Sequence, residues 1–135
     1  MRVLILVLSA FLVGCSAAIE SVADKAVFSS LVGRELHLKQ LSILLVRKER
    51  LYQPEIGYFL YPFTQADKIQ SGSITLPVGT QIIVTEVNQY TTDARGRWIG
   101  VVGSAVINNE EVEFIYQWSK YTPEELMVAP WEPIN

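Results

Sequence analysis

Cysteine and histidine are almost absent from this chain, which has one of each among its 135 residues. A single thiol cannot form a disulfide within the chain, and a histidine-based zinc site would need further histidine or cysteine ligands. Gly96, Gly100 and Gly103 lie in a β-type pattern rather than at the start of a helix, so they do not form a dinucleotide-binding loop. No G-x-S-x-G motif is present either. We therefore expect a protein that is not an enzyme and has no cofactor.

Long apolar runs are also scarce. The longest covers eleven residues, Val3 to Val13, and comes directly after the basic Arg2. At ~1.5 Å per residue in a helix, this run reaches about half of the ~30 Å hydrocarbon core, so it is too short to span a bilayer. Its length and basic flank are typical of a secretory signal.

The residues that close this run carry a resemblance to a known class of protein. Leu12-Val13-Gly14-Cys15 resembles the lipobox of bacterial lipoprotein precursors. The resemblance implies removal of the signal peptide, residues 1–14, and then lipidation of Cys15 with diacylglycerol and usually palmitate. In many such lipoproteins an aspartate after the lipidated cysteine retains the protein in the inner membrane. Here Ser16 takes that position, which resembles lipoproteins that go to the outer membrane. We therefore expect anchoring at the periplasmic face of the outer membrane. An uncleaved helix, or an ordinary signal with an incidental cysteine, is the alternative.

Charge and length constrain the mature chain. Loss of Arg2 with residues 1–14 leaves 10 basic and 14 acidic residues, a net charge of −4. This mild acidity gives no electrostatic reason to bind nucleic acid. The remaining 121 residues are enough for one domain. We expect residues 15–32 to be the lipidated terminus with a linker or short helix, and residues 33–135 to form the domain.

The first segment of the mature chain has a helical period. Ile19, Val22, Ala23, Ala26 and Val27 recur at i, i+3, i+4, i+7 and i+8, which predicts a short amphipathic helix within residues 16–30 that ends before a glycine at 33. The helix either lies on the membrane or leads to the domain.

From residue 33 the period changes to two, which is typical of strands. Alternation and β-branched runs predict strands around residues 36–38, 42–46, 57–61, 73–76, 81–90, 97–107 and 111–118. Asn108 and Asn109 predict a tight hairpin turn. Gly100 and Gly103, inside a strand, indicate a bend, a bulge or close approach of another backbone.

The C-terminal segment contains one further helix signal. Thr122-Pro123-Glu124-Glu125 has the pattern of a capping box with proline at the first helical position, which predicts a short helix through Val128. Pro130 and Pro133 then favour an extended tail.

Six or seven short strands without long helices predict a mainly β fold, an antiparallel meander closed into a small barrel. Leu76 to Thr80, then Ile83-Val84 and Arg97-Trp98-Ile99, resemble bacterial SH3-like small barrels over about a quarter of the chain. An OB-like or lipocalin-like barrel fits the same pattern.

Most charged residues are expected to be solvated. His37 alternates with Leu36 and Leu38, so it should point outward. Residues 47–50 are a mixed-charge cluster and predict a solvated turn. Residues 110–113 contain three glutamates at an expected hairpin tip, without the spacing of a calcium loop.

Aromatic residues supply the candidate binding surface. Trp98, Tyr116 and Trp118 should fill the core. Trp131 either straps across the barrel or anchors a partner. The residues with a candidate binding role are Tyr90, Arg95, Arg97, Trp98 and Trp131.

These features predict a membrane-anchored, non-enzymatic module that binds an envelope protein or a cell-wall component. A small envelope hydrolase, or its accessory, using His37 with a carboxylate is one alternative. A carrier of a small lipophilic ligand is the other, and a dry interior pocket would favour it.

Replacement of Cys15 by Ser should abolish lipidation, because serine has no thiol to form the thioether. We expect loss of palmitate labelling and release of the protein from the membrane fraction. Unchanged labelling and fractionation would contradict the anchor.

Overall fold

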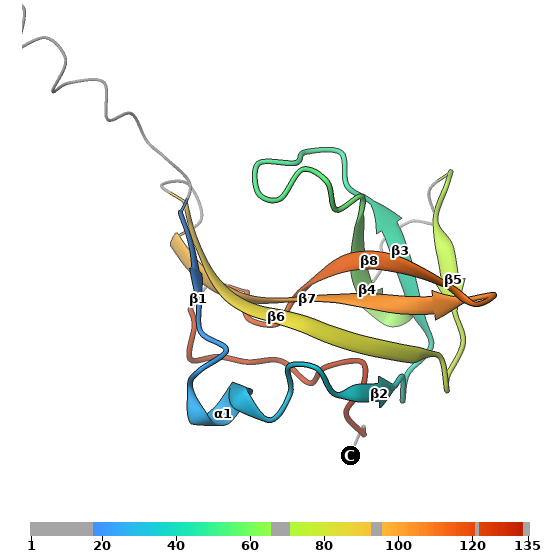
Figure 1. Ribbon diagram of the computed structural model, residues 1–135. Coiled ribbons are helices and arrows are strands. Elements are labelled where there is room, and N and C mark those ends of the chain that lie inside the picture. The colour runs from blue at the N-terminus through green and yellow to red at the C-terminus, as the bar shows by residue number, and fades with distance from the viewer. Residues whose placement is uncertain (1–17, 66–70, 93–95, 121, 134–135) are drawn as a thin grey trace, which may run out of the picture.

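The computed structural model describes residues 18–65, 71–92, 96–120 and 122–133. These residues form a mainly β domain around one mixed sheet of eight strands (Figure 1). The strand order is β1-β6-β7-β8-β4-β3-β5, and β2 also pairs with β6. The strands are β1 (Ala18–Ser21), β2 (Glu35–His37), β3 (Ser42–Val46), β4 (Tyr58–Pro62), β5 (Ile74–Leu76), β6 (Gln81–Thr92), β7 (Gly96–Ile107) and β8 (Glu110–Gln117). Within the described ranges, helical structure is limited to α1 (Ala26–Ser29) and the 3-10 turn η2 (Phe63–Gln65).

The sheet is open, so the prediction of a closed barrel is wrong. At one edge β1 and β2 pair with β6, and at the other edge β5 pairs with β3. The prediction of a purely antiparallel meander is also wrong, because β4 pairs in parallel with β8. Parallel strands need a crossover connection, which local alternation does not reveal. Here β5, β6 and β7 lie in that connection.

The main core lies on one face of the sheet. Alternate residues of β6, β7 and β8 contribute Val84, Val101 and Tyr116 to it. In a closed barrel further strands would cover this face. Here non-strand segments of the chain cover it. The covering side chains come from both ends of the described chain and are Val22, Phe28, Leu38, Ala129 and Trp131.

Most predicted strands are confirmed within a few residues, and β3 matches its predicted range. The hairpin between β7 and β8 is also confirmed, because Asn108 and Asn109 have φ of 50° and 66°. Such positive values are required at both central positions of a type I′ turn.

The predicted N-terminal helix is largely replaced by other structure. Residues 18–21 form β1 against β6, and only the single turn α1 remains. The amide of Val22 continues this pairing by donating to the carbonyl of Val87, at 2.9 Å. The long edge of β6 therefore supplies backbone partners that override the helical period. Residues 18–32 thus pack as part of the domain.

The predicted C-terminal helix is also wrong. Leu126 forms an antiparallel bridge with Ser119, and the amide of Met127 donates to the carbonyl of Trp118 at 2.8 Å. Of the capping-box pattern, a turn remains, closed by the Glu125 amide and the Thr122 carbonyl at 3.3 Å. Hydrogen bonds to the residues just after β8 have replaced those of a helix.

Gly103 confirms the expected close approach of another backbone. A Cβ at this position would lie 2.7 Å from the carbonyl oxygen of Ile83 and 3.0 Å from Cζ of Phe114. The pairing of β6 with β7 shifts register next to this glycine, between Val84 and Glu86. This bulge allows Val84 and Val87 to face the same core.

Gly103→Ala should lower the free energy of unfolding by about 1–3 kcal/mol, because the added methyl group overpacks a rigid carbonyl. Urea denaturation measures the change. Gly57→Ala is the matched control, since its Cβ would meet only the Arg50 side chain, at 3.4 Å. Equal stability of the two variants would contradict the close packing at Gly103.

Candidate functional site

The opposite face of the sheet carries a second apolar cluster. Its members are Tyr52, Ile56, Tyr90, Trp98, Val102 and Ile115. Because side chains alternate along a strand, Trp98 and Val102 face this cluster while Ile99 and Val101 face the main core. Residues 47–57, here called the β3–β4 loop, fold over this face and supply Tyr52 and Ile56.

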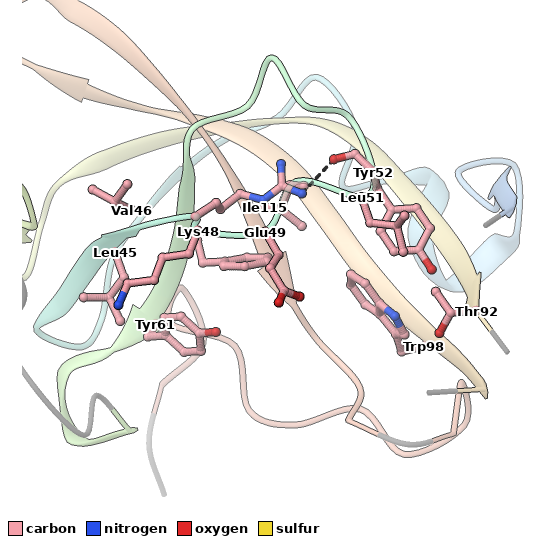
Figure 2. Close-up of a pocket in the computed structure, with 12 residues that line it drawn as sticks. Leu45, Val46, Lys48, Glu49, Leu51, Tyr52, Tyr61, Thr92, Trp98 and Ile115 are labelled. Atoms are coloured by element: carbon pink, nitrogen blue, oxygen red, sulfur yellow. Dashed lines mark hydrogen bonds between the residues drawn. The ribbon is translucent and has the colours of Figure 1, made fainter. Parts of the chain in front are cut away.

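The β3–β4 loop covers the second face incompletely and leaves a pocket of about 390 Å³ between loop and sheet (Figure 2). Eight of the twelve lining residues are aliphatic or aromatic. The lining residues are Leu45, Val46, Arg47, Lys48, Glu49, Leu51, Tyr52, Phe59, Tyr61, Thr92, Trp98 and Ile115. In Figure 2, Leu45 and Tyr61 lie at one end, and Trp98 and Thr92 lie at the other.

Arg47 holds the loop in place from inside. Its side chain is 3% exposed and donates to the backbone carbonyls of Gln53 at 2.9 Å, Ile56 at 2.7 Å and Tyr52 at 2.7 Å. The guanidinium carbon also lies 5.0 Å from the centre of the Phe59 ring. Burial lowers the pKa of Arg47, but an arginine stays charged at neutral pH. The loop carbonyls therefore stabilise a buried cation, and the cation fixes the loop.

Stacked aromatic rings form the end of the pocket near Thr92. Trp98 stacks on Tyr90 with ring centres 4.2 Å apart, and Tyr52 meets Tyr90 edge-on at 5.0 Å. Gly100 makes this stack possible, because a Cβ there would lie 2.7 Å from both rings. The Tyr90 hydroxyl donates to Oε1 of Gln53 at 2.7 Å, and burial raises the pKa of Tyr90 to about 12.

Two buried donors of the pocket-lining residues have no acceptor in the described structure. They are Nε of Arg47 and Nε1 of Trp98. A buried donor without a partner costs about 1–3 kcal/mol. Both atoms are enclosed by the surrounding protein, so this cost falls on the packing beside the pocket.

Of the five predicted binding residues, the four that the structure describes do not form one surface. Tyr90 is fully buried and Trp98 is 4% exposed, whereas Arg97 is exposed. Arg95, like Cys15, lies outside the described residues. Trp131 packs in the main core, 5.3 Å from Tyr116 and 5.6 Å from Trp118 between ring centres. Trp131 is therefore a strap, and Trp98 is the predicted residue that lines the pocket.

Sequence reasoning missed the β3–β4 loop. Arg47 was expected in a solvated turn and is buried instead. One signal was present, because Arg47 continues the alternation of Ile43 and Leu45 along β3. His37 is exposed as expected, with Nε2 4.0 Å from Oε1 of the exposed Glu35, and neither residue lines the pocket.

Comparison with protein-family models, with curated proteins and with solved structures finds no match. Among the described residues, no helix has the length and apolar character needed to cross a membrane. In the same part of the chain, no three histidine, cysteine, aspartate or glutamate side chains gather into a possible metal site.

Arg47→Lys should destabilise the domain by about 2–4 kcal/mol, because an ammonium cannot reproduce the three-carbonyl geometry and leaves carbonyls without donors. Amides of the β3–β4 loop should exchange faster with deuterium. Urea denaturation and hydrogen exchange measure the two effects.

Arg50→Lys is the control for this variant. It makes the same substitution in the same loop. Arg50 donates to the Pro54 carbonyl at 3.0 Å, but this hydrogen bond is exposed to water, so we expect a change within about 0.5 kcal/mol. Equal effects at the two positions would show that Arg47 is not what holds the loop.

Proposed function

We propose that this chain is a lipid-anchored lipoprotein of the cell envelope and that its β domain is a non-enzymatic binding module. Its binding site is the pocket under the β3–β4 loop, and its ligand is a small lipophilic molecule. The observation that carries the proposal is the apolar pocket of about 390 Å³ on a sheet face separate from the main core.

The size and lining of the pocket support ligand binding. Small-molecule sites in proteins have volumes of about 300–1,000 Å³ and mostly apolar walls with a few polar groups. Here Phe59 and Ile115 supply apolar surface from the sheet. Lys48 and Glu49 are exposed lining residues. An apolar molecule with a polar end fits this arrangement.

The buried Arg47 supports a preformed site. Its three hydrogen bonds order the loop before any ligand arrives. Less conformational entropy is then lost when a ligand binds, which favours affinity.

The N-terminal sequence supports the envelope anchor. Leu12-Val13-Gly14-Cys15 at the end of a short apolar run is similar to a lipobox. Two or three acyl chains hold a protein on a membrane, whereas one chain binds only marginally.

Docking of an envelope protein is the second candidate function. Leu51 is 68% exposed at the pocket, and an apolar side chain of a partner could cover it. Exposed apolar residues at a recess are typical of interfaces when they form a contiguous patch.

Leu51→Glu should weaken binding of the fluorescent apolar anion 1-anilinonaphthalene-8-sulfonate by at least about fivefold, because a carboxylate repels the anion and disfavours apolar contact. Residues 16–135 contain every described strand and core residue, so this fragment can be titrated without detergent. Val27→Glu is the control, since Val27 is also 68% exposed but does not line the pocket. No binding by the unaltered fragment would contradict the proposed function.

A further inference from the structure

One end of the pocket lies close to the first residue of β1. Ala18, the first residue of β1, is paired with Thr91 of β6. Thr91 accepts a hydrogen bond from the hydroxyl of Tyr52 at 3.0 Å, and the next residue, Thr92, lines the pocket with Tyr52. Backbone pairing and one side-chain hydrogen bond thus connect the start of β1 to the pocket wall.

The distance from the proposed anchor is short. Cys15 precedes Ala18 by three residues, and an extended chain covers at most ~3.6 Å per residue, so the two Cα atoms are no more than about 11 Å apart. In Figure 1 the first residues of β1 and the β3–β4 loop both lie toward the top of the molecule, whereas the C-terminal segment lies at the bottom. A lipid on Cys15 therefore holds the pocket end of the domain near the membrane surface.

We propose that the pocket binds an acyl chain of a phospholipid from the membrane to which the domain is anchored. This inference rests on the proposed function and names its ligand class. The lipid source is the bilayer itself, which the short connection from Cys15 keeps next to the pocket.

The apolar part of the pocket has the form that an acyl chain requires. The end of the pocket next to the Ala18–Thr91 pair is here called the anchor end. The pocket runs from Leu51 and Trp98 at the anchor end to Leu45 and Tyr61 at the other end (Figure 2). Leu51, 68% exposed, is placed where an apolar chain would leave the bilayer and enter the protein. Contact with an acyl chain would remove this side chain from water.

Trp98 supplies apolar ring surface at the end of the pocket nearer to Cys15. It is opposite Tyr90, next to the pair formed by Thr91 and Arg97, and it lines the pocket. A phospholipid acyl chain that enters the pocket at this end would therefore contact the Trp98 ring while its hydrocarbon extends toward Leu45. Tryptophan is enriched at membrane interfaces.

Quenching by brominated phospholipid tests the proposal on the full, lipidated chain. The protein is reconstituted into phosphatidylethanolamine–phosphatidylglycerol vesicles that contain a phosphatidylcholine brominated on its acyl chain. Bromine quenches tryptophan fluorescence at contact. Of the three tryptophans, Trp98 lines the pocket, whereas Trp118 and Trp131 lie in the main core. We expect quenching of the Trp98 contribution and its loss in Trp98→Phe.

Leu51→Glu should reduce this quenching at least fivefold, and Val27→Glu should leave it unchanged. Thermal unfolding of each variant checks that the fold is retained. Absence of quenching in the unaltered protein overturns the proposal. This result would also follow if the acyl group on Cys15 itself filled the pocket. Equal quenching in Leu51→Glu and the unaltered protein overturns the proposal as well.

The anilinonaphthalene titration separates this inference from the proposed function. Probe binding without quenching by brominated lipid means that the pocket binds a ligand from another source. Absence of both signals means that the proposed function is wrong as well.

Discussion

Strand β7 is buried on both of its faces, and this constraint accounts for the arrangement of the rest of the chain. Eight consecutive residues, from Trp98 to Ala105, are buried. A sheet that is apolar on both sides must be covered on both sides. The N-terminal and C-terminal segments cover one face with Val22 and Trp131, and the β3–β4 loop covers the other with Tyr52 and Ile56. The β3–β4 loop leaves part of this second face uncovered, and the pocket lies there.

The β3–β4 loop is held on the sheet by the buried cation of Arg47 as well as by apolar contact. A loop of eleven residues, Arg47 to Gly57, has many backbone carbonyls to satisfy. Arg47 satisfies three of them with one side chain. This solution is costly if any partner is lost, because an uncompensated buried charge is strongly destabilising. The same cost makes the loop conformation specific, and the shape of the pocket depends on it.

Local residue patterns predicted the strands well, because strand alternation and turn chemistry are local. The Asn108–Asn109 turn and the glycine at 103 are examples, since both answer a backbone requirement that only a few residue types meet. The order of the strands was not predictable in the same way. Pairing of β4 with β8 joins residues far apart in the sequence, and no local pattern carries that information.

Both helix predictions failed for one physical reason. The segments at residues 16–30 and 122–128 have local helix signals, but residues 18–21 lie beside the edge of β6, and Leu126 lies beside Ser119, just after β8. Pairing with these neighbouring segments satisfies the same backbone hydrogen bonds and brings the residues that follow, Val22 and Ala129, into the main core, so tertiary contact overrides propensity. For the site, the aromatic Trp98 was predicted, whereas the loop that encloses it was not. The apolar residues on both alternating positions of β7 were the available sign of a second covered face.

Strand β6 joins the two features on which the functional proposals depend. One of its edges pairs with β1, three residues after Cys15, and its Tyr90 supports the ring of Trp98 in the pocket. A long flexible linker would let an anchored domain take any orientation. Here the pairing of β1 begins at Ala18, so little chain is left to decouple the domain from an anchor at Cys15. The orientation of the domain relative to an anchor at Cys15 would then be set by the sheet, through the pairing of β1 with β6.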